Sequence, residues 1–178
     1  VIIKVAKNKN EINISNLAEK NAKQALKQKL IQSDTNNNLI DELASKFNLN
    51  NSIELIEVYD NSHIQGTDSV GSLICFGNEG FVKKRYRKFN IKDEKIKNDD
   101  YGMMKEVLFR RFSKAIKEKS GSLTLPDLII IDGGKGQYSV SREILNELGL
   151  HDLPILAVAK GKKRNAGEEK IYHKGKEF

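Results

Sequence analysis

The chain has 178 residues, of which 38% are hydrophobic and 31% charged, and its formal net charge is +7. This mixture is typical of one folded domain plus an appendage, and it excludes wholesale disorder, collagen-like repeats and coiled coils. No apolar run approaches the roughly 20 residues of a membrane span. The single cysteine, Cys75, excludes an internal disulfide and a zinc knuckle. We therefore expect a cytoplasmic protein with no membrane contact.

The basic excess is concentrated in one short stretch beside two aromatic residues. Its five cations fall within six positions: Lys83, Lys84, Arg85, Arg87 and Lys88. Such a cluster favours a polyanionic partner, although a solvated strand face would show the same pattern. We favour nucleic-acid contact, made mostly to phosphates.

The first 50 residues have the pattern of a helical lead-in to a larger domain. After Ser15 as N-cap, apolar residues at helical spacing predict a helix at 16–32, a polar linker at 34–38 and a short second helix at 39–47. A segment of this size cannot form a core alone. We therefore expect a lead-in over residues 1–50 and the main domain over residues 51–178.

From residue 53 onward, three consecutive strands come first, and helices then alternate with strands. The expected strands are 53–59, 69–76, 81–90, 127–131 and 155–159, and the expected helices are 101–119 and 137–148. A meander followed by two right-handed crossovers gives an α/β fold with a mixed sheet, antiparallel at first and then parallel. This is the element order of the ribonuclease H-like fold.

Asp60 and Asp132 each follow one of two strands that this order places side by side. Both carboxylates are expected in the crevice at one sheet edge, where open α/β sheets bind ligands. Adjacent carboxylates repel one another unless a cation or proton lies between them, and hard oxygen ligands favour Mg²⁺ or Mn²⁺. The pattern predicts a metal site for phosphodiester hydrolysis, with turn capping by the two aspartates as the alternative.

Further residues flank this pair. The glycine-rich run that follows Asp132 lets backbone N–H groups face an anion, and Lys135 within it is expected to face phosphate. The run lacks the spacing of a Walker A loop. His63 is expected to orient Asp60 as a hydrogen-bond partner. Asp99 and Asp100 either favour the start of the next helix, or one of them reaches the metal.

The segments that carry these features are 56–66, 86–91, 99–111, 126–137 and 157–161. Together they resemble the C-terminal endonuclease domain of UvrC, the nuclease subunit of the bacterial UvrABC excision-repair system. The resemblance implies a ribonuclease H-like domain that makes the incision 5′ to a DNA lesion with a divalent metal. It also implies that Asp60 and Asp132 are catalytic metal ligands, and it associates Asp100 with incision.

The same resemblance implies partners and shows one departure. The partners are damaged double-stranded DNA and the UvrB subunit, acting with UvrA in damage recognition. The family completes its site with a histidine in an Asp-Glu-Ala-His-Arg stretch, which does not occur before Phe178, and His173 is not in that context. We therefore expect a fragment that is inactive or weakly active alone. The alternative is a non-catalytic nucleic-acid-binding module of the same fold, which would tolerate loss of the carboxylates.

Overall fold

The computed structural model describes residues 5–49, 52–64, 68–93, 96, 99–117, 124–161 and 169–178, with the backbone alone at 63, 64 and 68. The helices are α1 (Lys9–Lys46), the 3-10 helix η1 (Lys83–Arg85), α2 (Asp100–Lys117) and α3 (Lys135–Glu147). The strands are β1 (Leu55–Ile64), β2 (Asp68–Gly77), β3 (Gly80–Phe81), β4 (Arg87–Asn90), β5 (Leu128–Asp132), β6 (Ile155–Ala159), β7 (Lys170–His173) and β8 (Lys176–Glu177).

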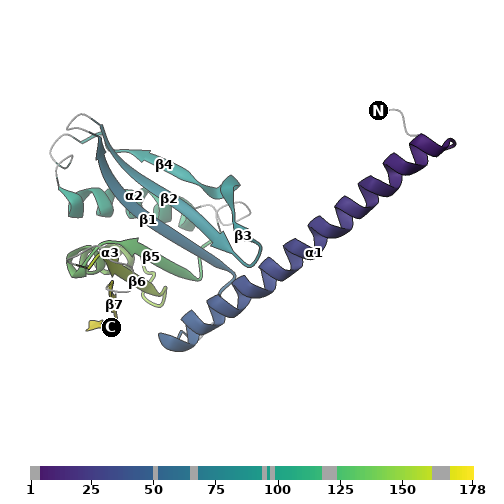
Figure 1. Ribbon diagram of the computed structural model, residues 1–178. Coiled ribbons are helices and arrows are strands. Elements are labelled where there is room, and N and C mark those ends of the chain that lie inside the picture. The colour runs from purple at the N-terminus through teal and green to yellow at the C-terminus, as the bar shows by residue number, and fades with distance from the viewer. Residues whose placement is uncertain are drawn as a thin grey trace.

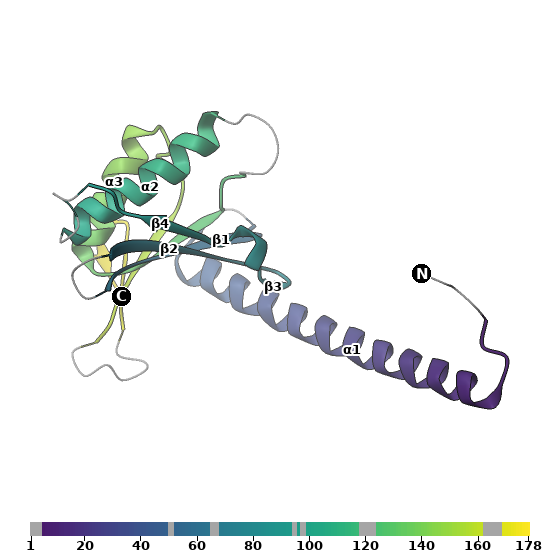
Figure 2. The same cartoon turned by 90° about the horizontal axis from the view of Figure 1, so that it is seen from above.

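One mixed sheet connects the described strands in the order β3-β2-β1-β5-β6-β7-β8, and β4 also pairs with β2. β1 is antiparallel to β2 and parallel to β5, and β5 is parallel to β6. The predicted mixed sheet is therefore confirmed. Figure 2 shows α2 and α3 on one side of this sheet and α1 on the other.

The edge hairpin β7 and β8 was not expected from the sequence. Its strands pair antiparallel around Lys174 and Gly175, which both have positive φ. Two consecutive residues with positive φ form the tight turn that matches the twist of a β-hairpin. This turn was the sequence signal from which the hairpin could have been predicted. The short, polar strands around it concealed the hairpin.

The prediction of two helices in the lead-in is wrong, because α1 is a single helix of 38 residues. It begins after Asn8, whose side chain accepts a hydrogen bond from the Glu11 N–H, and Ser15 lies inside it. Residues 34–38 contain no proline or glycine, and asparagine weakens a helix by only a fraction of a kcal/mol. Asn36 also donates to the Asn78 carbonyl at 3.3 Å, so part of the polar stretch is supported by the sheet.

α1 extends far beyond the rest of the molecule (Figure 1), and only its C-terminal part packs against the sheet. None of the helices in the described part of the chain has the length and apolar character that a membrane crossing requires.

Two strand predictions also need correction. β1 does not stop before Asp60 but continues to Ile64, because these residues pair with β2 as far as Asp68. The third strand is not continuous: β3 and β4 both pair with β2, and η1 separates them. Arg85 donates to the carbonyl and hydroxyl of Thr124, which holds the η1 turn out of the ladder.

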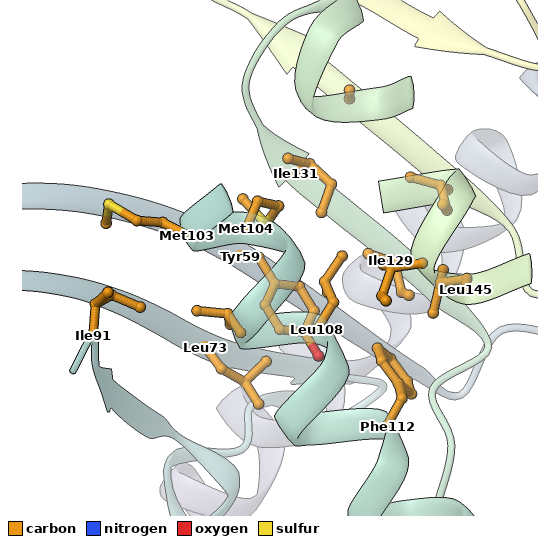
Figure 3. Packing of buried hydrophobic residues seen from close by; sticks show 14 of the residues in the cluster. Tyr59, Leu73, Ile91, Met103, Met104, Leu108, Phe112, Ile129, Ile131 and Leu145 are labelled. Carbon is orange, nitrogen blue, oxygen red and sulfur yellow. The ribbon is translucent and has the colours of Figure 1, made fainter. Parts of the chain in front are cut away.

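The main core lies between the sheet and the helices α2 and α3. Figure 3 shows its side chains converging from β1, β5 and α2, among them Tyr59, Ile129 and Phe112. A second cluster joins the opposite sheet face to α1, through Ile40 and Leu128 among others. Because β5 is buried on both faces, its run is apolar at nearly every position.

A buried ion pair ties β1 to α2 across the main core. Arg111 lies 2.6 Å from Glu57, and the two side chains are 4% and 1% exposed. The Tyr59 hydroxyl donates to the other Glu57 oxygen at 2.6 Å, and Arg111 also donates to the Thr124 carbonyl. Burial, followed by the Glu57 charge, raises the pKa of Tyr59, so this hydroxyl remains a donor.

Arg111→Met should lower the free energy of unfolding by about 3–5 kcal/mol, because Glu57 would stay buried without its partner. Urea denaturation measures this loss. Arg110→Met is the matched control: the neighbouring arginine pairs with Glu106 at 3.0 Å near the surface. Its loss should not exceed about 1 kcal/mol. Equal losses of unfolding free energy in the two variants would mean that the buried ion pair contributes no more to stability than the pair near the surface.

Candidate active site

The parallel pairing of β1 with β5 brings the two predicted aspartates together. The last paired residues are Tyr59 and Ile131, so Asp60 and Asp132 come next on neighbouring strands. Asp132 stands at the carboxyl end of β5, as predicted, although it is the last residue of that strand and does not follow it, whereas Asp60 lies within β1. Their adjacency therefore comes from the shared register and not from two strand ends.

Both aspartates line one small pocket, together with Asp100 from the first turn of α2. The complete lining is Asp60, Asn61, Asp100, Met104, Asp132, Gln137 and Lys160. The structure thus places all three predicted acidic site residues at one location, on elements that are far apart in the sequence.

The two strand aspartates interact electrostatically with each other and with Lys160. The pKa of Asp60 is raised, first by burial and then by the negative charge of Asp132, and the ammonium group of Lys160 partly opposes this shift. Lys160 Nζ lies 3.0 Å from Asp132 Oδ2. The ammonium group of Lys160 therefore already places a positive charge beside the carboxylate pair.

The adjacent aspartates at the start of α2 have different surroundings. The Asp99 carboxylate accepts a hydrogen bond from the Tyr101 N–H at 3.0 Å, as an N-terminal cap does. Asp100 lines the pocket, and its carbonyl accepts from the Asn61 side chain at 3.3 Å. Of the two alternatives left open by the sequence, helix capping describes Asp99, and a position at the pocket describes Asp100.

The glycine-rich turn contributes to the pocket through a residue other than the one predicted. Gln137 lines the pocket, and its side-chain oxygen accepts from the Gly134 N–H at 3.1 Å. Lys135, the first residue of α3, is exposed and lies outside that lining. Its contact with phosphate stays a prediction. The side chain of His63 lies outside the described residues, so its predicted role stays one too.

The basic stretch divides into exposed lysines and engaged arginines. Lys83, Lys84 and Lys88 are exposed. Arg85 donates to Thr124, and the Arg87 guanidinium donates to two nearby backbone carbonyls at 2.7 and 3.0 Å. The lysines are thus the better candidates for contact with an external polyanion.

Sequence reasoning missed Lys160, Gln137 and Asn61 as pocket residues. Lys160 directly follows β6, the parallel neighbour of β5, so its position after a strand was an available signal. No sequence signal identified Asn61 as a pocket residue, because the direction of its side chain depends on how β1 pairs with its neighbours.

The donors present suit a hard divalent cation. Among the described residues, no three His, Cys, Asp or Glu side chains cluster closely enough to hold a metal. Mg²⁺, however, commonly takes only one or two carboxylates and completes its shell with water and substrate oxygens. Asp60 and Asp132 would supply those carboxylates. Asn61 Oδ1 is buried without a hydrogen-bond donor among the described atoms, and it lies against Gly71 and not against these carboxylates.

The profile of the family described as "UvrC RNAse H endonuclease domain" matches residues 44–178. The chain belongs to this family. Its relatives include UvrABC system protein C of Hyphomonas neptunium, 51% identical over 89% of this chain and 27% of that protein. The same protein of Cereibacter sphaeroides is 50% identical, over 89% of this chain and 26% of its own length. The chain thus spans about a quarter of the UvrC proteins that it matches.

Solved structures show a more distant likeness to this UvrC domain. The catalytic domain of human endonuclease V is 18% identical, with a TM-score of 0.43 over 61% of this chain and 45% of that one. The ribonuclease H-like fold follows instead from the family match and the mixed strand order.

Asp60→Asn should stabilise the metal-free chain at neutral pH. Because the folded pKa of Asp60 is raised, its ionisation favours unfolding, and stability falls as pH rises through that folded value. Below the ordinary value of 3.8, the carboxyl is protonated in both states and the cost disappears. Urea denaturation in EDTA should therefore show a gain at neutral pH and little change near pH 3. A variant that is less stable at neutral pH would contradict this account.

Proposed function

We propose that this domain makes the metal-dependent incision 5′ to a lesion in damaged double-stranded DNA. The observation that carries the proposal is the placement of Asp60 beside Asp132 by the β1–β5 register. The pKa of Asp60 is raised, first by burial and then by the charge of Asp132, so ionising this carboxyl beside its neighbour has an electrostatic cost. Such a cost is typical of sites where a cation or proton is part of the function.

Asp60 and Asp132 would hold Mg²⁺ or Mn²⁺ in the pocket that Asp100 also lines. A bound divalent ion supplies Lewis-acid stabilisation of a phosphodiester and lowers the pKa of a bound water. The chain's own contribution is to hold the backbone that carries these carboxylates. The Ser72 hydroxyl donates to the Asp60 backbone carbonyl at 3.2 Å, and the Asn61 side chain donates to the Asp100 backbone carbonyl.

Lys160 supplies a second positive charge at the reacting group. In the structure its ammonium contacts Asp132, yet its side chain is 67% exposed and flexible enough to turn toward a phosphate. An ammonium near the scissile phosphate would offset the negative charge that increases in the transition state. We assign Lys160 this role in the same reaction.

The exposed lysines mark a path for the DNA backbone away from the pocket. Asp60 pairs with Ser72, and Ser72 pairs with Lys88, so the three side chains share one sheet face. Two strand spacings put Lys88 roughly 10 Å from Asp60, which is within reach of neighbouring phosphates. Lys83 and Lys84 continue this charge along the same edge.

The proposal includes the partners that the relatives' name suggests. The matched relatives are UvrABC system proteins. We infer that this domain acts on DNA together with the UvrB and UvrA subunits, in the cytoplasm, and that the choice of lesion lies outside the pocket described above.

Asp132→Asn, introduced into the complete UvrC protein, should abolish the 5′ incision and leave the 3′ incision intact. The substitution keeps the side-chain shape and removes the charge that would hold the metal. Incision of a lesion-bearing duplex, assayed with UvrA and UvrB on a gel that separates the two cuts, measures the effect. We expect a loss of at least about 100-fold, in the range seen when an electrostatic contributor to catalysis is removed.

Glu143→Gln is the matched control for this experiment. This substitution also removes one negative charge, but Glu143 lies on α3 outside the pocket lining, where it pairs with Lys105 at 2.7 Å. Its 5′ incision should equal that of the wild type. Retained 5′ incision by the Asp132→Asn protein would refute the proposed function and favour a non-catalytic DNA-binding module.

Replacing Lys83, Lys84 and Lys88 with alanine should weaken DNA binding and flatten its salt dependence. Each lost phosphate contact reduces the slope of log K against log salt by about 0.9 for duplex DNA, so three contacts remove up to about 3. Fluorescence anisotropy with a duplex at several salt concentrations measures both quantities.

A triple alanine variant at Lys46, Lys114 and Lys117 removes the same charge from the last turns of α1 and α2 and serves as control. An equal change of slope in both variants would assign the effect to net charge alone. Arg85→Ala should act instead on stability, because Arg85 already bonds Thr124.

A further inference from the structure

The Tyr101 side chain, which is 48% exposed, lies so close to Gly136 that any side chain at position 136 would require the phenol ring to shift. A Cβ atom added to Gly136 would lie 2.3 Å from the Tyr101 hydroxyl oxygen and 2.5 Å from the ring carbon that bears it. The phenol therefore lies directly against the glycine backbone.

The contact joins the two helix starts that border the acidic pocket. Tyr101 is the second residue of α2 and directly follows Asp100. Gly136 is the second residue of α3 and stands four positions after Asp132. The Tyr101 ring thus connects α2, which carries Asp100, to the start of α3, which follows Asp132.

The other contacts at the start of α2 come from different directions. The Asp99 carboxylate caps the Tyr101 N–H, and the Asn61 side chain from β1 donates to the Asp100 carbonyl. Among the contacts described for this turn, the Tyr101 ring provides the link to α3. The rest of α2 also contacts α3, for example through the Lys105–Glu143 ion pair, so loss of the ring would affect the first turn of α2 and not the whole helix.

We propose that Tyr101 is a positioning residue, which fixes Asp100 relative to Asp132 by packing its phenol ring on Gly136. The consequence for metal binding rests on the function proposed above. The consequence for the two helix starts rests on the contact alone.

Titration of the chain with Mn²⁺, followed by calorimetry, tests this role with the variants Tyr101→Ala and Gly136→Ala. The first removes the ring and the second displaces it, so both should weaken Mn²⁺ binding by about tenfold or more, the range for residues that support metal ligands. Tyr101→Phe keeps the ring and should retain most of the affinity. Melting temperatures, recorded in parallel, separate this effect from unfolding.

Gly134→Ala is the matched control, because a Cβ there would have only Ala159 Cβ nearby, at 3.9 Å. It should leave Mn²⁺ affinity unchanged. The double variant Tyr101→Ala with Gly136→Ala should bind Mn²⁺ like Tyr101→Ala alone, because the added methyl group then has no ring to displace.

Other outcomes separate the two proposals. Folded Tyr101→Ala protein with unchanged Mn²⁺ affinity would overturn the positioning role, and weaker DNA binding in that protein would make Tyr101 a DNA contact instead. A wild-type chain that binds no Mn²⁺ would count against the proposed function. In that case amide hydrogen exchange still tests the contact between Tyr101 and Gly136. Exchange should accelerate in the first turns of α2 and α3 in the Tyr101→Ala and Gly136→Ala variants. Unchanged exchange would overturn the positioning role.

Discussion

The parallel pairing of β1 with β5 is the contact on which the candidate site depends. Its register sets Tyr59 against Ile131 and therefore Asp60 beside Asp132, although 72 positions of sequence numbering separate the two aspartates. A slip of one residue would turn either side chain to the other sheet face. The buried pairing of Glu57 with Arg111 opposes such a slip in β1, because the slip would carry the Glu57 carboxylate to the sheet face away from α2.

Charge is handled in two ways along the same strand. Glu57 is buried and matched by Arg111 and the Tyr59 hydroxyl, which makes it part of the core. Asp60, three residues further on, is exposed to the pocket and incompletely compensated by Lys160. A fully matched carboxylate has little capacity to bind a further cation. An incompletely matched pair retains that capacity, which is why the pocket and not the buried ion pair supports a catalytic proposal.

Much of the fold could be predicted because its signals are local. The apolar run of β5, the helix α3 and the strand β6 each depend on a few neighbouring residues, and each lies within two residues of its expected bounds. The failures involve distant partners. The continuous helix α1 is supported at Asn36 by Asn78, and the η1 turn is held by Arg85 on Thr124. The two residues of each pair lie far apart in the sequence, so no local sequence pattern reveals their contact.

The sequence by itself determined the family, the mixed sheet and the aspartates that belong at its edge, because motif spacing and apolar periodicity are properties of the chain alone. Only the tertiary structure decided which polar groups surround them. It separated Asp99 from Asp100, brought Lys160 to Asp132 and laid Tyr101 on Gly136. These are contacts between different elements, and their geometry is fixed by how the helices pack on the sheet, which side-chain identity alone does not encode.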